Sequence, residues 1–359
     1  MSSNKYEIIA SEIKDKILLG EIAEGDKIPS ENILSEKYDV SRQTVRKALS
    51  ILNDEGLIES VHGKGTFCRK QASRRTSSKN IGVVITYIND YIFPLILKGI
   101  YDVLDKKNYS IILKSTTNGR DREKQCLEDI LTKNVDGLII EPSKSEIAWK
   151  NRELVRRFDQ VGVPYVFIQS RYDHMEHSPV IKTDDELGTK ILTNHLIDLG
   201  HKNIAGIFQA DITQGVSRHK GYAKTLQSRG LVYNPDNVIW FHVEDKFGKT
   251  EWAIEALLKN DPSIDAIVCY NDMIAYKVIE VLNSLGIRVP EDVSITGYDA
   301  QAQDEPGAFK LTTVTHPKEN LGRKAAEVLL KLLEGDTDVK SEYVFKPEFV
   351  EGLSCKKRS

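Results

Sequence analysis

The chain has 359 residues, of which 40% are hydrophobic and 29% are charged, so it is long enough for about two or three folded domains. Its 50 basic and 53 acidic residues give a formal net charge of -3, which excludes a histone-like polycation and a disordered acidic chain. The charge is unevenly distributed, because residues 62–79 contain six basic residues and no acidic one. This stretch favours a polyanionic partner near the N-terminal part.

No apolar run approaches the roughly 18 residues that a membrane helix requires, and the N-terminus lacks the apolar segment of a signal peptide. We therefore expect a cytoplasmic protein. The four cysteines are too widely dispersed for a zinc or redox motif. We expect them to be reduced thiols, and we expect no metal and no other cofactor.

The chain divides at a polar segment. Between Arg69 and Lys79 there is one small apolar residue, Ala72, and the other positions are Ser, Thr, Gln, Arg and Lys without a period. Such a segment cannot bury a face and predicts a mobile linker. We place a first domain at residues 1–68, the linker at 69–80 and a second domain at 81–359.

The first domain starts with the pattern of two helices. Apolar residues from Tyr6 to Ile17 recur at helical spacing and end before Gly20, a residue suited to a helix end. Ser30 is placed to cap a second helix that runs to about Tyr38.

A third helix and a hairpin follow. Ser41 is placed to cap a helix that stops at Gly56. Residues 57–61 and 66–68 then read as two short strands around the glycine-containing turn 62–65. Three helices followed by a basic hairpin predict a winged helix-turn-helix domain.

The exposed side of the third helix begins with Arg42, Gln43 and Arg46. The major groove of DNA admits one helix, and Arg and Gln at its N-terminal end reach the base edges. When the helix is considered alone, a merely solvated charged face is the preferred interpretation, because charged residues four positions apart are common on helices.

Three segments resemble the DNA-binding domain of the GntR family: Pro29-Ser30-Glu31, residues 41–49 and residues 63–67. The resemblance covers about residues 4–68. It implies contacts with operator DNA by Arg42, Gln43, Thr44 and Arg46 on the third helix, by His62 and Gly65 in the wing, and by Lys5 and Glu31 as helpers. For Glu31, a favourable charge at a helix N-terminus is an alternative role.

From Ile81 onward, short apolar runs alternate with amphipathic segments. Continuous apolar strands separated by helices predict an α/β fold with parallel sheets that are covered on both faces. Strands are expected at 81–86, 110–113, 137–140, 165–168, 204–208, 266–269 and 293–296, with helices that include 186–199, 215–228 and 273–285.

Ligands of such sheets bind beyond the carboxyl ends of the strands. Carboxylates, amides and guanidinium groups bind hydroxyls, and aromatic rings cover the apolar face of a pyranose, so the residues at these ends favour a sugar. Asp272 is expected to cap a helix instead. The candidates are Tyr91, Phe93, Glu141, Gln169, Arg171, Asp211, Asn271 and Asp299.

The segments 195–204, 218–222, 271–273 and 290–299 resemble the effector domain of the LacI/GalR repressors, which is similar to periplasmic sugar-binding proteins. The resemblance implies two lobes joined by three crossovers near residues 182, 300 and 315, a sugar in the cleft, and a homodimer. It implies ligand contacts by Arg218, Asn271 and Asp299, followed by Glu141, Gln169 and His316. The family often has a second Asp where this chain has Ala300.

A GntR-type DNA-binding domain (the reader) joined to a LacI-type effector domain resembles the bacterial arabinose-responsive repressors. Residues 87–94, Glu141 to Ser145 with Lys144, and residues 211–216 are similar to theirs. The resemblance implies a transcriptional repressor of sugar-utilisation genes that L-arabinose releases from its operator. An activator remains an alternative, as does a sugar-binding protein of transport type.

An enzyme is the remaining alternative. Residues 247–250 are similar to the end of a phosphate-binding loop, but the first glycine of that motif is replaced by Val243. Residues 173–177 contain two histidines and two carboxylates, and a solvated loop explains them better than a metal site. We expect no enzymatic activity.

Overall fold

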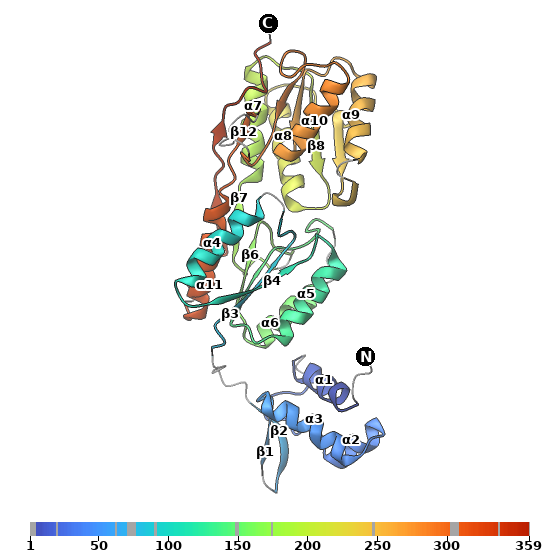
Figure 1. Ribbon diagram of the computed structural model, residues 1–359, viewed down its shortest axis with the longest axis vertical. Helices are drawn as coiled ribbons and strands as arrows, with labels where there is room; N and C mark the ends of the chain where they lie inside the picture. The colour runs from blue at the N-terminus through green and yellow to red at the C-terminus, as the bar shows by residue number, and fades with distance from the viewer. Residues whose placement is uncertain are drawn as a thin grey trace.

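The computed structural model consists of a small N-terminal domain at one end of a long molecule and two α/β lobes stacked beyond it (Figure 1). His62, Tyr91 and residues 70–76 of the expected linker lie outside the described residues. The structure describes residues 5–18, 21–61, 63–69, 77–89, 92–147, 151–173, 175–245, 248–301, 309–336 and 338–358.

The N-terminal domain is a winged helix-turn-helix, as the sequence predicts. It consists of α1 (Lys5–Leu18), α2 (Glu31–Tyr38), α3 (Arg42–Asp54) and an antiparallel hairpin of β1 (Ile58–Val61) and β2 (Gly65–Cys68). Its core includes Ile9, Ile13, Leu34, Val45, Ala48, Leu52 and Ile58. The Ser30 hydroxyl accepts a hydrogen bond from Ile33 N (3.4 Å), and the Ser41 hydroxyl accepts one from Thr44 N (3.2 Å). Both predicted N-caps are therefore present.

The first lobe contains a parallel six-stranded sheet in the order β13-β7-β6-β5-β3-β4. Alternate residues of its strands point to opposite faces, so Val83 packs under α4 and α11, whereas Val84 packs under α5 and α6. The strands are β3 (Asn80–Ile85), β4 (Ser110–Ser115), β5 (Gly137–Ile140), β6 (Tyr165–Ile168), β7 (Val180–Thr183) and β13 (Glu342–Phe345), and the helices are α4 (Phe93–Asp105), α5 (Arg120–Thr132), α6 (Arg152–Gln160) and α11 (Lys318–Leu333).

The second lobe contains a parallel four-stranded sheet in the order β11-β10-β8-β9. Helices α7 and α8 cover one face around Phe208 and Tyr222, and helices α9 and α10 cover the other around Ile267 and Val278. The elements are α7 (Asp185–Asp198), β8 (Ile204–Gln209), α8 (Thr213–Ser228), β9 (Val238–Phe241), α9 (Gly248–Asn260), β10 (Ala266–Cys269), α10 (Asp272–Ser284) and β11 (Ser294–Thr296).

The chain passes between the lobes three times: from β7 to α7, from β12 (Thr313–Val314) to α11, and from β13 to β14 (Phe349–Val350). The first two passages match those expected near residues 182 and 315. The third lies near residue 347 rather than near 300, because β13 joins the edge of the first sheet before the chain returns. Asp299 and Gln301 stay in the second lobe, where Gln301 N donates to Asp272.

No membrane-spanning helix is present in the described part of the chain, where every helix is too short or too polar to cross a bilayer.

Candidate functional site

The start of α3 carries polar side chains that face solvent. Arg42 and Gln43 are exposed in the turn that Ser41 caps. Thr44 is half-buried, and its hydroxyl lies 2.9 Å from that of Ser41. Four of the expected DNA contacts, Arg42, Gln43, Thr44 and Arg46, therefore share the first turns of α3.

Arg46 is held by the neighbouring helix. Its side chain is 70% exposed, and its Nε atom lies 2.9 Å from both carboxylate oxygens of Glu31 at the start of α2. Glu31 thus fixes the direction of the Arg46 side chain, a role that sequence reasoning did not foresee.

The hairpin adds a second basic feature. Gly65 has a φ of 116°, a conformation that glycine adopts readily and other residues avoid. A Cβ atom at Gly65 would lie 2.7 Å from Cε of Lys27, so glycine allows this cation to approach the hairpin. Sequence reasoning did not single out Lys27. Lys5 is exposed at the start of α1, and His62 lies outside the described residues.

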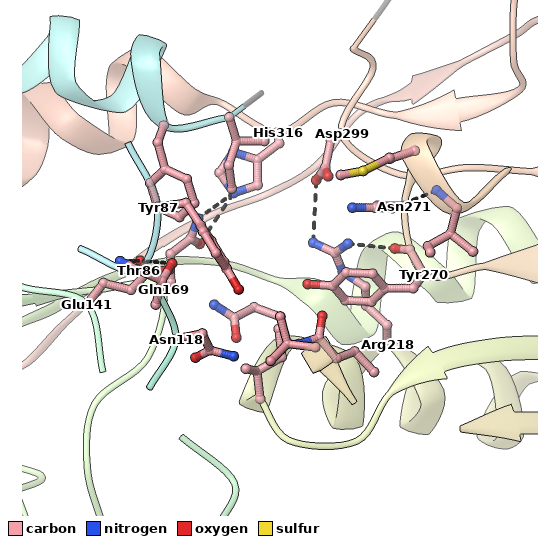
Figure 2. Close-up of a pocket in the computed structure, with 18 of the residues that line it drawn as sticks. Thr86, Tyr87, Asn118, Glu141, Gln169, Arg218, Tyr270, Asn271, Asp299 and His316 are labelled. Carbon is pink, nitrogen blue, oxygen red and sulfur yellow. Dashed lines mark hydrogen bonds and ion pairs between the residues drawn. The ribbon is translucent and has the colours of Figure 1, made fainter. Parts of the chain in front are cut away.

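A cavity lies between the two lobes of the large domain. Figure 2 shows side chains of the first lobe, such as Glu141 and Gln169, facing Arg218 and Asn271 of the second. The polar lining consists of Thr86, Asn118, Glu141, Gln169, Gln209, Gln214, Arg218, Asn271, Asp299 and His316, and the remaining lining of Tyr87, Ile92, Phe93, Pro142, Ile212, Phe241, Val243, Tyr270, Met273 and Ile274.

Arg218 is the centre of a buried charge network in this cavity. Its Nε donates to Asp185 (2.8 Å), its Nη1 to the Tyr270 carbonyl (2.6 Å), and its Nη2 lies 3.4 Å from Asp299 Oδ1. The guanidinium group also lies 3.5 Å from the ring centre of Tyr298. Burial lowers the pKa of Arg218, but the two carboxylates outweigh burial and keep that pKa well above its ordinary value. Arg218 is therefore a fixed cation that already holds two carboxylates.

Asp299 adopts a strained backbone conformation. Its φ is 95°, which is unfavourable for a residue with a side chain. Its carbonyl accepts a hydrogen bond from Lys318 Nζ (2.5 Å) at the start of α11. Burial lowers the pKa of Lys318, while Asp299 and Asp272 oppose this effect. Lys318 was not predicted as a site residue, because only the fold brings α11 to this strand end.

Two polar pairs line the first-lobe side of the cavity. The Glu141 carboxylate accepts hydrogen bonds from Thr86 N (2.8 Å) and the Thr86 hydroxyl (2.6 Å). Gln169 Nε2 lies 3.1 Å from His316 Nε2. Burial lowers the pKa of His316 to about 4, so this imidazole is neutral at neutral pH. Its buried Nδ1 has no hydrogen-bond partner among the described residues, nor has Gln214 Oε1.

The helix cap at the start of α10 differs from the expectation. Asn271, not Asp272, is the N-cap, and its Oδ1 accepts a hydrogen bond from Ile274 N (3.0 Å). Asp272 accepts hydrogen bonds from Gln301 N and from the Thr313 hydroxyl instead. Burial raises the pKa of Asp272 to about 7. Asp272 therefore ties α10 to the strand end that carries Asp299.

Aromatic rings lie on both sides of the cavity. Tyr87 and Phe93 of the first lobe have ring centres 6.3 Å apart, and Phe241 and Tyr270 of the second have ring centres 5.9 Å apart. Tyr91 lies outside the described residues. The cavity therefore combines flat apolar surfaces with hydrogen-bonding groups.

Three of the expected ligand residues do not line the cavity. Arg171 donates to the Ser341 carbonyl and to Glu342 at the edge strand β13. Lys144 forms an ion pair with Glu244. Asp211 is buried, and its carboxylate accepts a hydrogen bond from Gln209 (2.8 Å).

The cavity also contains residues that were not predicted. Tyr87 and Gln214 lie in segments that resemble those of the arabinose-responsive repressors, so this resemblance could have identified both residues. Tyr270 directly follows β10, and Asn118 follows β4 at a distance of three residues. Thr86 and Gln209 end or follow their strands and could have been found by the strand-end rule.

A possible metal-binding group lies beside the cavity. Ligand atoms of Asp211, His242 and Glu244 lie within 4.8 Å of one another. Gln209 already donates to Asp211, and the Lys144 ammonium group pairs with Glu244. The Lys144 ammonium group thus supplies at Glu244 the positive charge that a cation would bring.

Comparison with known proteins gives matches over both parts of the chain. The model of the bacterial regulatory proteins of the gntR family matches residues 5–68, and that of the periplasmic binding protein-like domain matches residues 193–355. An arabinose metabolism transcriptional repressor of Halalkalibacterium halodurans is 37% identical over 96% of this chain and 95% of its own length. The protein of the same name from Geobacillus stearothermophilus is 37% identical over 98% of each chain.

A solved complex of the transcriptional regulator CelR with cellobiose covers 91% of this chain and all of its own, with a TM-score of 0.69 and 22% identity. At this identity the similarity concerns the fold, and it supports the arrangement of two lobes around a cavity.

Proposed function

This chain belongs to the family of the arabinose metabolism transcriptional repressors, and we propose that L-arabinose in the interlobe cavity releases it from its operator. The observation that carries this proposal is the cavity itself. It lies between the two lobes, and it is lined by groups that bind hydroxyls.

Each part of the cavity has a chemical role in the proposal. Arg218 donates charge-assisted hydrogen bonds to ring or hydroxyl oxygens, while Asp299 and Glu141 accept hydrogen bonds from hydroxyl groups. Asn271, Gln169 and His316 complete the polar contacts. The rings of Tyr87, Phe93, Phe241 and Tyr270 cover the apolar C–H face of the sugar.

The operator is the second partner. We propose that Arg42, Gln43 and Arg46 read base edges in the major groove, and that Thr44 contacts the backbone. Lys5, His62 and the backbone around Gly65 add phosphate or minor-groove contacts, and Glu31 acts through Arg46. This role needs a cytoplasmic protein, since the operator is chromosomal DNA.

Repression and release follow from two lobe arrangements. We propose a homodimer whose two readers bind half-sites at a fixed spacing. A sugar weakens this binding only if it favours an arrangement in which the readers are poorly spaced. A coupling of about 1 to 3 kcal/mol corresponds to roughly 5- to 150-fold weaker operator binding.

The relatives are transcriptional regulators, and we propose no enzymatic activity for this chain. A transport-type binding protein would use the same two-lobed fold but has no use for a DNA reader. An activator differs only in the position of its operator relative to the promoter, which no residue encodes.

A thermal-shift screen over pentoses and hexoses tests the proposal. A sugar that binds only the folded state stabilises it by about 2.7 kcal/mol at a hundredfold excess over its dissociation constant. We expect L-arabinose to raise the melting temperature at the lowest concentration. If no sugar raises it, the cavity is not a sugar site.

A further inference from the structure

Next to the cavity, the loop that follows β5 in the first lobe contacts the second lobe directly. The Ser145 hydroxyl accepts a hydrogen bond from Thr213 N (2.9 Å) and one from the Thr213 hydroxyl (2.9 Å). Glu146 N donates to the Asp211 carbonyl (3.3 Å), and Lys144 forms an ion pair with Glu244. Three residues of this loop, Lys144, Ser145 and Glu146, thus meet three residues of the second lobe.

The Ser145 hydroxyl supplies the N-cap hydrogen bond that helix α8 lacks within its own segment. The N-cap position of α8 is Ile212, whose side chain cannot accept a hydrogen bond from the first N–H groups of the helix. Ser145 accepts the hydrogen bond of Thr213 N from across the cleft. Helix α8 is therefore capped by the opposite lobe, and it carries Gln214 and Arg218 into the cavity.

The loop is firmly attached to its own lobe. Ser143 N donates to Glu123 (2.7 Å), and Lys144 N donates to Asn118 (2.8 Å). Lys144 has a φ of 45°, so the loop holds a left-handed residue to place its neighbours. Because the loop cannot follow the second lobe by itself, its contacts with α8 form only when the lobes are close together.

These contacts lie immediately outside the cavity wall. Pro142, Ile212, Gln214 and Val243 line the cavity, whereas their near neighbours Ser145, Thr213 and Glu244 do not. In Figure 2, His316 and Asp299 lie on one side of the cavity, and Asn118, which binds the loop, lies on the opposite side. The loop therefore closes the side away from the passages between the lobes.

We propose that Ser145 and Lys144 form a closure latch that strengthens the binding of a ligand small enough to be fully enclosed, namely a free monosaccharide. The proposal rests on the proposed function of the cavity as a sugar site. When the lobes close over a monosaccharide, Ser145 caps α8 and Lys144 meets Glu244. A sugar with a large substituent that projects past Pro142 and Val243 keeps the lobes apart, and the latch then contributes nothing.

The test compares Ser145→Ala with Ser228→Ala in the full-length protein. Ser228 lies at the other end of α8 and bonds within its own helix, to the Thr225 carbonyl, so it is a matched control. We expect Ser145→Ala to weaken L-arabinose binding by about 2- to 30-fold, the range for loss of a helix cap, mainly through faster dissociation. Ser145→Thr, which keeps the hydroxyl, should restore wild-type dissociation.

Three further measurements separate a latch from a merely structural residue. Operator affinity and melting temperature without sugar should be the same for Ser145→Ala and Ser228→Ala. The p-nitrophenyl arabinoside should bind the wild type at least tenfold more weakly than L-arabinose, and Ser145→Ala should narrow that difference.

The outcomes distinguish the latch from the sugar site. If the wild type binds no sugar, both proposals fail. If the wild type binds L-arabinose but Ser145→Ala dissociates at the rate of Ser228→Ala, the latch alone is wrong. Equal binding of L-arabinose and its p-nitrophenyl glycoside by the wild type would also overturn it.

Discussion

The DNA-reading surface and the interlobe cavity differ in the burial of their side chains and in how far apart those residues lie in the sequence. The side chains at the start of α3 come from one short segment and remain exposed, with Arg46 70% exposed. The cavity residues come from strand ends and helices spread between Thr86 and His316, and the charges of the cavity are buried, with Arg218 only 4% exposed. Water solvates the first set, whereas the protein must neutralise the second.

This difference predicts how substitutions behave. An exposed reader residue can be removed at little cost to folding, so its loss affects only DNA binding. A buried cavity residue contributes both to the free energy of unfolding and to ligand binding, because its removal leaves its buried hydrogen-bond partners unpaired. The following predictions test that division, beginning with the largest expected effect.

Arg218→Ala should lower the free energy of unfolding by about 3 to 5 kcal/mol, because Asp185 and Asp299 remain buried without their cation. It should also abolish the response to sugar. Urea denaturation followed by calorimetric titration with L-arabinose measures both effects. A variant with wild-type stability would show that the buried network does not need this cation, which would contradict the division.

Arg42→Ala should weaken operator binding by about 1 to 3 kcal/mol if Arg42 reads a base, and should leave the melting temperature unchanged. If Arg42 instead holds a phosphate, the salt dependence of binding should fall by about one charge. Operator titrations at several salt concentrations separate these roles. Wild-type affinity at every salt concentration would remove Arg42 from the interface.

The neutral His316 predicts a pH dependence of stability. Its pKa is about 4 in the folded protein and about 6.5 when unfolded, so below pH 6.5 the unfolded state binds the additional proton. The stability contributed by His316 is therefore present above pH 6.5 and is lost as the pH falls toward 4, by up to about 1.4 kcal/mol per pH unit.

His316→Gln removes this titration. Denaturation between pH 7 and 4.5 should show that the variant loses less stability on acidification than the wild type does. Asp272, whose raised pKa acts in the opposite direction, is common to both proteins and cancels in the difference. Parallel pH profiles of the two proteins would mean that His316 is not held neutral by burial.

The smallest effect is expected for Glu31→Gln in the reader. The Glu31–Arg46 pair is exposed, so its loss should change stability by no more than about 1 kcal/mol. Operator affinity should change by less than tenfold, with looser discrimination at the base that Arg46 faces. A large drop in stability would show that reader contacts also carry folding energy.

The same division explains what could be predicted from the sequence. The DNA-binding domain could be predicted because its signals are local. Ser30 and Ser41 cap the helices that follow them directly, and the apolar positions of α3 lie within one short segment. The seven predicted strands of the two lobes were found within about two residues by their apolar runs, since parallel strands are buried on both faces. Strands β7, β9 and β13 were not predicted. Local patterns of this kind do not depend on the rest of the fold.

The cavity was harder to predict because its geometry depends on distant pairings. Arg171 follows β6 as a ligand residue should, but β13, far along the chain, lies nearby and offers Glu342 as its partner. Lys318 reaches Asp299 only because the chain returns to the first lobe after β12. Asp272 looked like a helix cap, and only the position of Gln301 and Thr313 shows its actual role.

The central claim is that sugar in the buried cavity weakens DNA binding at the exposed reader. Fluorescence anisotropy with an operator selected from random duplexes measures it, with and without saturating L-arabinose. The account predicts a dissociation constant that rises about 5- to 150-fold with the sugar and a smaller or absent rise for Arg218→Ala. An unchanged operator affinity, under conditions where L-arabinose demonstrably binds, would contradict it.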